Sequence, residues 1–179
     1  IPDECHNPEV YVHLTGGWVY LSGSTESGLK DYELQDLKFT VEKDIVGNVI
    51  GYTIEYSNGD VYEGTFTAGV ITGYGKFTYS DYDVYEGNLL NGVKHGNGTY
   101  TWSDGSYYTG NFEKGLKDGQ GKQVWSDGAS YSGTYHEDSR DGQGTYTFSD
   151  GSTYTGDVKY DVREGHGTFT WANGESYTG

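Results

Sequence analysis

The sequence predicts an all-β protein: an elongated, single-layer, twisted antiparallel sheet of tandem β-hairpins with an N-terminal β cap. Three observations lead to this prediction. Asp-Gly and Asn-Gly pairs, which favour tight hairpin turns, stand between runs of β-forming residues. The 179-residue chain contains 30 Gly and 19 Tyr but only 2 Pro, so its strands can run without interruption. A Tyr-x-Gly triplet recurs every 23 residues, which indicates a repeat array, and it begins at Tyr62, Tyr85, Tyr108, Tyr131, Tyr154 and Tyr177.

Residues 1–49 lack this period and form the predicted cap, which would cover the first open edge of the array. Strands are predicted at Val10–Leu14, Trp18–Leu21 and Lys38–Val41, because each of these runs is rich in β-branched and aromatic residues. The apolar spacing of residues 31–37 is too weak to assign a helical turn.

Residues 50–179 form the predicted array, a half-repeat with its turn at Asn58-Gly59 followed by about five repeats. The last repeat is cut at Gly179, so we expect the chain to be a piece of a longer protein. Each repeat has a first strand with Tyr-x-Gly, a return loop ending in Gly-x-Gly, a second strand, and a two-residue type I′ turn such as Asp104-Gly105. We expect distortion at Asp81-Tyr82-Asp83, which replaces the usual turn pair.

Alternation along the strands predicts one aromatic face and one face of Thr, Ser and Glu. The rings should lie over glycine backbone and stack on rings of the next repeat, at about 0.5–1.5 kcal/mol per good pair. A single layer has no second layer to cover this face. Either the stacked rings cover themselves, or the face is a groove for a partner peptide, a second copy or a sugar.

The bulk composition excludes several classes of partner. A net charge of −16 argues against nucleic acid and against adsorption to anionic membrane lipid, and it fits a basic partner.

The one cysteine, Cys5, precludes an intrachain disulfide. No apolar run approaches the roughly 20 residues of a membrane span.

Residues 50–179 resemble the MORN repeat family. The likeness is clearest in Tyr85-Glu86-Gly87, in Gly92-Val93-Lys94-His95-Gly96-Asn97-Gly98 and in the stretch 104–110. This resemblance implies protein–protein interaction, dimerisation and the organisation of structures at membranes or the cytoskeleton, and therefore a cytoplasmic location. The sequence departs from the family pattern where His is usual, at Thr72, Asp118, Asp141 and Glu164.

Two charged columns run along the return loops with the same period of 23. The basic column is Lys94, Lys117, Arg140 and Arg163, and the acidic column is Asp118, Asp141 and Glu164. We interpret them as charge compensation between repeats, each pair worth under about 1 kcal/mol. The alternative is a row of acids for Ca²⁺ or a basic partner, but no calcium-binding loop of alternating acids is present. The histidines have no zinc-ligand spacing, so no metal or cofactor is predicted.

Nothing in the sequence indicates an enzyme. No nucleophile elbow is present, and Gly-x-Gly lacks the strand–helix context of a phosphate loop. The acids lie in turns and loops rather than in a cleft, which argues against glycoside hydrolysis.

The sequence therefore predicts a non-catalytic scaffold that binds a protein through the aromatic face and forms a homodimer or end-to-end assembly. The alternatives are an extracellular carbohydrate- or cell-surface-binding repeat protein, with a glycan as ligand, and an accessory region of a larger enzyme. The predicted partner-binding residues are Tyr79, Tyr85, Trp102, Tyr108, Phe112, Trp125, Tyr131, Tyr135, Phe148, Tyr154 and Trp171.

Overall fold

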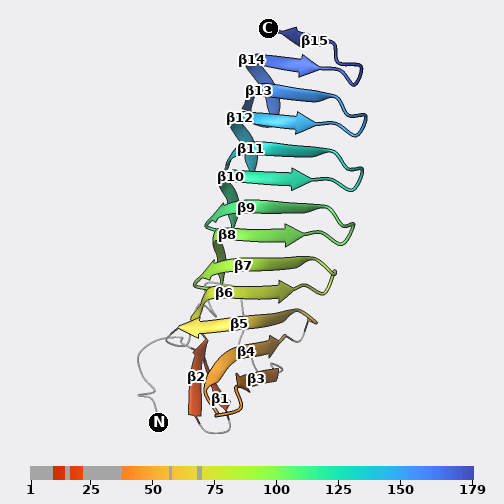
Figure 1. Ribbon diagram of the computed structural model, residues 1–179. Coiled ribbons are helices and arrows are strands. Elements are labelled where there is room, and N and C mark those ends of the chain that lie inside the picture. Colours follow the sequence, from red (N-terminus) through yellow and green to blue (C-terminus); the bar gives the residue numbers. More distant parts are fainter. Residues whose placement is uncertain (1–9, 15–16, 22–37, 57, 68–69) are drawn as a thin grey trace. The chain divides into compact units, whose positions relative to one another are not determined.

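The computed structural model describes residues 10–14, 17–21, 38–56, 58–67 and 70–179 (Figure 1). Every regular element in these ranges is a β-strand, and none is a helix long and apolar enough to cross a membrane. β1 (Val10–Leu14) and β2 (Gly17–Leu21) pair antiparallel as a two-stranded sheet, which confirms the first predicted hairpin. The interpretation of residues 31–37 concerns residues outside these ranges.

The other strands form one open antiparallel sheet of 13 strands that follows the order of the sequence. The predicted all-β hairpin array is therefore confirmed. The chain divides into two compact units, residues 1–81 with 86–93, and residues 82–85 with 94–179. The predicted boundary at residue 49 stays a prediction. The strands of the first unit are β3 (Lys38–Lys43), β4 (Val49–Glu55), β5 (Val61–Thr67) and β6 (Val70–Thr78).

The second unit contains most of the regular repeats, whose hairpins follow one another in a stack (Figure 1). β7 (Val84–Leu90) supplies residues to both units. The strands of the second unit are β8 (Val93–Thr101), β9 (Tyr107–Glu113), β10 (Leu116–Val124), β11 (Ser130–His136), β12 (Ser139–Thr147), β13 (Thr153–Lys159), β14 (Val162–Thr170) and β15 (Ser176–Thr178).

The Asx-Gly turns have three loop residues rather than the predicted two. The Trp102 amide donates to the Ser106 carbonyl and the Gly105 amide to the Trp102 carbonyl, both at 2.9 Å. Only the glycine has a positive φ, +85°, so this is a type I turn closed by a left-handed glycine. Tyr82 stands in the glycine place of its turn with φ +73°, so a glycine-like conformation is kept where we expected distortion.

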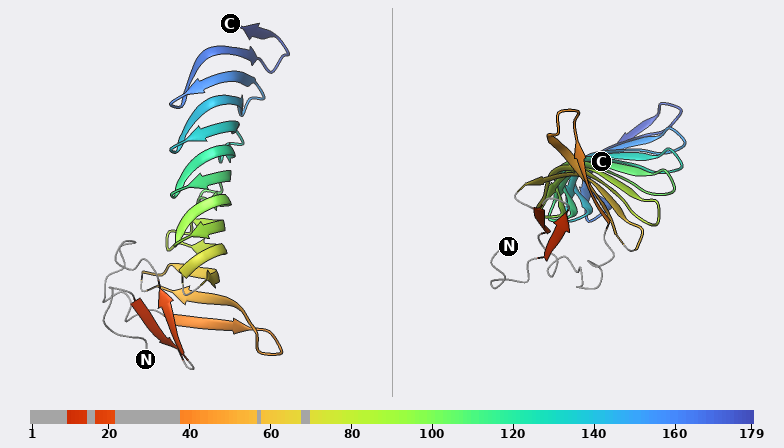
Figure 2. Two further views of the ribbon diagram at one scale, coloured as in Figure 1. Left: turned by 90° about the vertical axis from the view of Figure 1, so that its left-hand side faces the viewer. Right: turned by 90° about the horizontal axis from the view of Figure 1, so that it is seen from below.

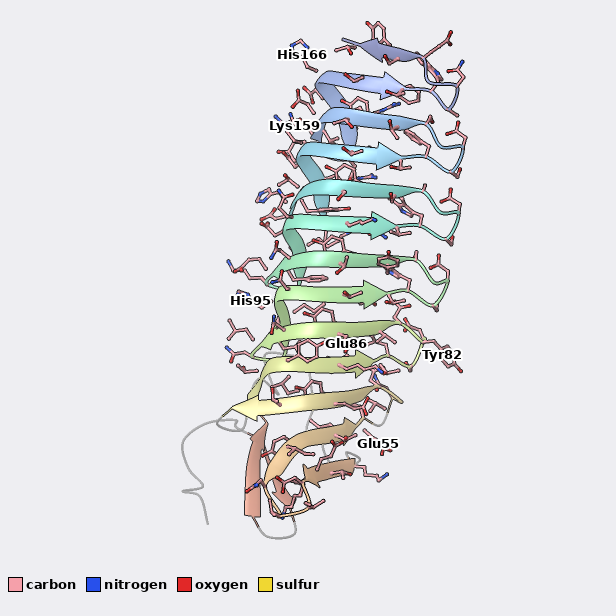
Figure 3. The ribbon with its side chains drawn as sticks, in the orientation of Figure 1. Glu55, Tyr82, Glu86, His95, Lys159 and His166 are labelled. Atoms are coloured by element: carbon pink, nitrogen blue, oxygen red, sulfur yellow. The ribbon has the colours of Figure 1, made fainter. Side chains whose placement is uncertain are left out.

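Two-residue turns of the I′ kind occur instead at the opposite end of the hairpins. Both residues have positive φ at Lys114-Gly115 (+50° and +87°) and at Glu137-Asp138 (+46° and +69°). Figure 3 shows the two ends, with Tyr82 at one and His95 and His166 at the other. The expectation of a return loop ending in Gly-x-Gly is wrong, because those glycines lie within nine-residue strands such as β10.

The Gly-x-Gly positions bend the strands. Gly119 has φ +103°, and the β10–β9 register shifts between Lys117 and Gly121. A bulge of this kind bends its strand and increases the local twist. Strands of the second unit accordingly appear as curved arcs in Figure 2. In the second unit this curvature forms a trough, in which Lys117 and Arg140 lie over aromatic rings.

The core of the second unit is a row of tyrosines lying on glycine backbone. Tyr108 is fully buried, and a Cβ added to Gly121 would overlap the Tyr108 hydroxyl oxygen. That hydroxyl donates to the Asn111 carbonyl at 2.9 Å. The Tyr108 and Tyr135 rings meet edge to face across the repeat boundary, with centroids 5.1 Å apart. The prediction that rings lie over glycine and contact the next repeat is confirmed.

Candidate functional site: the aromatic trough of the second unit

A row of half-buried and exposed rings follows the ends of β8, β10, β12 and β14. We call Trp102, Trp125, Phe148 and Trp171, one from each of these hairpins, the rungs. Ring contacts through Tyr146 and Phe169 connect the last three of them. The centroid distances along this path, from Trp125 to Trp171, are 6.3, 5.9, 5.8 and 5.0 Å.

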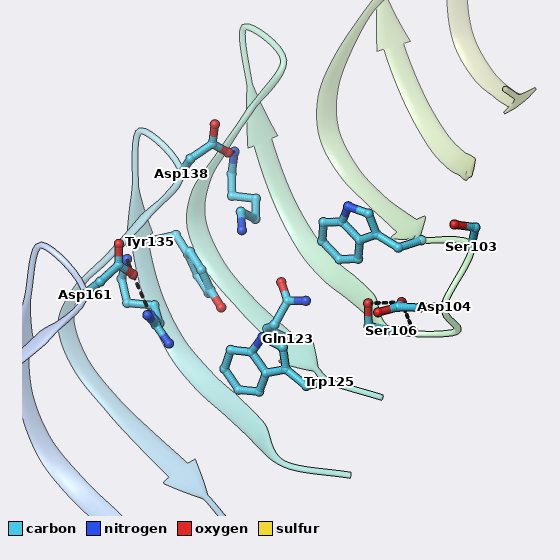
Figure 4. Close-up of a pocket in the computed structure, with 11 residues that line it drawn as sticks. Ser103, Asp104, Ser106, Gln123, Trp125, Tyr135, Asp138 and Asp161 are labelled. Carbon is cyan, nitrogen blue, oxygen red and sulfur yellow. Dashed lines mark hydrogen bonds and ion pairs between the residues drawn. The ribbon is translucent and has the colours of Figure 1, made fainter. Parts of the chain in front are cut away.

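A hollow of about 560 Å³ lies beside the first two rungs, with Trp102 and Trp125 both in its lining (Figure 4). Gln123 stands there at the position that Tyr100, Tyr146 and Phe169 occupy in other repeats. Gln123 is buried and contributes an amide where those repeats contribute a ring. A missing ring therefore accounts for space at this point in the row.

Tyr135 lines the same hollow and has a buried hydroxyl without a partner. Its side chain is 3% exposed, and among the described residues its Oη is the buried side-chain polar atom with no hydrogen-bond partner. Other repeats carry hydroxyl-free residues at this position, such as Phe112 and Val158. Burial raises the pKa of Tyr135 well above its ordinary value, against the opposing charge of Arg140, so the group is a neutral donor near pH 7. Figure 4 shows the Tyr135 side chain among the residues that line the hollow.

A family model for the MORN repeat matches five consecutive segments, residues 62–84, 85–107, 108–130, 131–153 and 154–176. The chain belongs to the MORN repeat family. The residues of the hollow come from four of these MORN repeats, with Trp102 in the second and Asp161 in the fifth. Comparison with curated proteins gave no match.

Solved structures of CPAP and SAS-4 domains resemble this MORN array. The TCP domain of SAS-4 (dCPAP) from Drosophila melanogaster, in complex with a proline rich motif of Ana2, is 17% identical, with a TM-score of 0.46 over 78% of this chain and 82% of that chain. The CPAP G-box domain is 14% identical, with a TM-score of 0.38 over 79% and 98%. The E1021V mutant of the TCP10 domain of Danio rerio CPAP is 18% identical, with a TM-score of 0.33 over 79% and 81%.

The basic column of the MORN repeats lies inside the trough. The Lys117 Nζ is 5.9, 5.5 and 5.3 Å from the ring centroids of Trp102, Tyr108 and Tyr135. Burial lowers its pKa, which Asp138 partly offsets, and no carboxylate of the described residues comes within ion-pair distance of its ammonium. Lysine therefore contributes both a cation–π contact and an available donor.

Turn aspartates bind the backbone of this column, and Asp161 also forms an ion pair with Arg140, which the sequence interpretation missed. The Asp138 amide donates to the Lys117 carbonyl at 2.9 Å, and the Lys117 amide donates to Asp138 Oδ1 at 2.8 Å. Asp161 makes the same exchange with Arg140 and also accepts from its Nε at 2.5 Å. The sequence did contain a signal for this arrangement. Positions 92, 115, 138 and 161 are equivalent in successive repeats, and the residue is Gly at the first two and Asp at the last two.

The acidic column has other partners. Asp118 accepts from the Glu137 amide at 3.2 Å and lies 3.0 Å from His136 Nδ1. Within the part of the chain that the structure describes, no ion pair joins the basic column to the acidic column. Asp141 is half-buried and Glu164 is exposed. The described residues contain no group of three or more His, Cys, Asp or Glu placed to hold a metal ion.

The predicted partner-binding residues fall into two groups. The first group is buried and forms the floor of the trough or the core around it: Tyr85, Tyr108, Phe112, Tyr131, Tyr135 and Tyr154. The second is half-buried or exposed and offers surface: Tyr79, Trp102, Trp125, Phe148 and Trp171. Partner binding by these residues stays a prediction. Gln123, Lys117 and Asp138, which line the hollow with Trp102 and Trp125, were not among them.

Proposed function

We propose that this MORN array is a non-catalytic protein-interaction module whose trough in the second unit binds a segment of a partner protein. MORN repeats are typically interaction modules. The observation that carries the proposal is the hollow lined by Trp102 and Trp125, with the unpartnered Tyr135 hydroxyl in its wall.

The surroundings of the hollow favour a protein ligand. Tryptophan and tyrosine are the residues most enriched in the energetic centres of protein interfaces. The rings are held by contacts with their neighbours, so little side-chain freedom remains to be lost on binding. The floor beneath them is fully buried tyrosine and is therefore a rigid base.

A peptide-selection experiment tests this function and does not require the identity of the partner. Peptides displayed on phage are selected on the wild-type protein and then measured against the double variant Trp102→Ala/Trp125→Ala. We expect selected peptides to lose at least about tenfold in affinity on the double variant. Tyr160→Asn, which removes an exposed ring from a turn residue that does not line the hollow, is the matched control and should bind as the wild type does.

Selected peptides that bind the double variant as tightly as the wild type would contradict the proposal. Circular dichroism and urea unfolding of each variant establish that the strands are intact. We propose separately that the chain self-associates, and light scattering of the wild-type chain at several concentrations tests this.

A further inference from the structure

We propose that the hollow of the trough receives an uncharged aromatic side chain, tyrosine or phenylalanine, from the partner segment. The bound ring completes a row of rings that the chain itself leaves interrupted. This inference rests on the proposed interaction function and names the anchor residue of the partner. Three features of the second unit support it: the gap in the row of rings, the position of Lys117 and the mixture of charges around the hollow.

The row of rings is interrupted at Gln123, whose equivalents in the flanking repeats are Tyr100 and Tyr146. The Tyr146 ring contacts two rungs, with its centroid 6.3 Å from Trp125 in the preceding repeat and 5.9 Å from the rung of its own repeat. Within the described residues no ring links Trp102 to Trp125 in this way, and the hollow lies between them. A ring placed in the hollow can therefore contact both tryptophans, as Tyr146 contacts its two rungs.

Lys117 lacks the ring that lies nearest to the equivalent cations of the flanking repeats. Lys94 Nζ is 4.7 Å from the Tyr100 centroid, which is the shortest of its three ring distances. The Arg140 guanidinium carbon is 5.1 Å from the Tyr146 centroid, again the shortest of three. Lys117 is half-buried and lines the hollow where this ring is missing. Because an ammonium is attracted to the face of an aromatic ring, Lys117 favours an aromatic group over an aliphatic group of the same size.

The charges around the hollow favour an uncharged anchor. The hollow is lined by two cations and three carboxylates: Lys117, Arg140, Asp104, Asp138 and Asp161. A basic anchor would meet the two cations and an acidic anchor the three carboxylates, so each would approach charges of its own sign. An uncharged ring avoids this repulsion, and burial of its apolar surface against the tryptophans is favourable without an ion pair.

Two small molecules that differ in the ring provide the first test. 4-Methylphenol reproduces the side chain of tyrosine, whereas 4-methylcyclohexanol has a similar size and the same hydroxyl but no aromatic face. Each is titrated into the full 179-residue chain, and the indole N–H signals of the tryptophans are followed by NMR. We expect the phenol to bind at least about fivefold more tightly, because ring contacts and the cation–π contact add to the burial of its surface.

Three variants locate the bound ring. Gln123→Tyr restores the residue of the flanking repeats, fills the gap and should weaken binding of the phenol about tenfold or more. Lys117→Met keeps an unbranched side chain but removes the charge, so the preference for the phenol over the cyclohexanol should fall to about twofold. Lys94→Met is the matched control, because this lysine already lies over Tyr100, and it should leave the preference unchanged. Urea unfolding of each variant shows that the fold is kept.

The phage-selected peptides extend the test from a small molecule to a protein segment. We expect each selected peptide to contain an aromatic residue whose replacement by alanine weakens binding about tenfold or more. Replacement of the same residue by cyclohexylalanine, which keeps the size but not the aromatic face, should weaken binding about fivefold on the wild type. On Lys117→Met the same replacement should cost about twofold or less, because the cation that distinguishes the two rings is absent.

The possible outcomes separate this inference from the proposed function. Equal affinity for the phenol and the cyclohexanol, or no binding of either, overturns the inference. Binding of the phenol that persists in Gln123→Tyr also overturns it, because the ring then lies elsewhere. Selected peptides that require Trp102 and Trp125 but tolerate alanine at every aromatic position overturn it while leaving the interaction function intact. A selection that yields no peptide dependent on the two tryptophans overturns both.

Discussion

The floor of the trough and its rungs are built from the same class of residue, yet they differ in what lies beneath the ring. Tyr108 and Tyr131 in the floor are fully buried on glycine backbone, and each hydroxyl donates to a carbonyl three residues later. Trp102 and Trp125 are half-buried and flank a hollow. A ring that lies on glycine backbone and has its hydroxyl hydrogen-bonded contributes to the stability of the fold. A ring that lacks a neighbouring ring keeps exposed surface, which a ligand can contact.

Alkali should have the largest effect, because it acts on several buried tyrosines at once. Burial raises the pKa of Tyr131 to about 12, and the same holds for Tyr62 in the first unit. An unfolded tyrosine ionises near pH 10, so the unfolded state loses its protons first. Stability is therefore fully present below about pH 10 and is lost progressively towards pH 12.

Thermal unfolding at several pH values, with tyrosinate absorbance recorded in parallel, checks this prediction. Absorbance and strand content should change together between about pH 10 and about pH 12. Tyrosines that all titrate near their ordinary pKa while the sheet persists would show that the floor is accessible to water, and the contrast with the rungs would disappear.

Gly121→Ala should destabilise the floor by about 2–3 kcal/mol, because a Cβ there would overlap the Tyr108 hydroxyl oxygen. The control is Gly128→Asn, where a Cβ meets nothing within 4 Å and asparagine tolerates the φ of +86°. Urea unfolding measures both variants. A loss for Gly121→Ala no greater than that of the control would mean that the Tyr108 ring moves aside freely.

A pair of hydroxyl deletions sharpens the comparison. Tyr108→Phe removes a satisfied hydrogen bond to Asn111 and should lower stability by about 1 kcal/mol. Tyr135→Phe removes a buried hydroxyl with no partner and should leave stability unchanged or raise it by about 1 kcal/mol. Unfolding free energies in urea give the sign for each. Equal losses in the two variants would show that Tyr135 has an acceptor in the folded chain.

The smallest effect is expected at the strained turn formed by Tyr160 and Asp161. Tyr160 has φ +46° in its two-residue turn, a conformation that asparagine adopts more readily. Tyr160→Asn should raise stability by about 0.5 kcal/mol and leave peptide binding unchanged. Differential scanning calorimetry detects the corresponding rise in Tm. A lower Tm would indicate that the exposed ring contributes more than the backbone strain costs.

Much of the architecture could be predicted because a 23-residue period repeats the same local chemistry. Tyr-x-Gly and Gly-x-Gly correctly indicated rings lying on glycine, and the alternation correctly placed Tyr100 with Trp102 on one face. The turn types could not be read in the same way. Glu137-Asp138 adopts the left-handed conformation without a glycine, because the paired strands and the bond to the Lys117 carbonyl hold it there.

The candidate site was only partly within reach of the sequence. Gln123 and Tyr135 each break the pattern of their column, so both exceptions were visible among the repeats. Their meeting in one hollow was not visible, because they lie on different strands of a curved sheet. The sequence likewise showed that Lys117 and Asp138 are charged, but it did not show that they lie beside the rings.

The sequence by itself determined the hairpin order, the tyrosine–glycine floor and the acidic surface, since each depends on residues close together in the chain or one full period apart. Tertiary structure alone decided which rings are covered, where the hollow lies and which acids compensate the basic column. The physical reason is the bend at Gly-x-Gly, which curls the hairpins of the second unit. It brings Arg140 and Tyr146, from opposite ends of β12, against the same Trp125 ring.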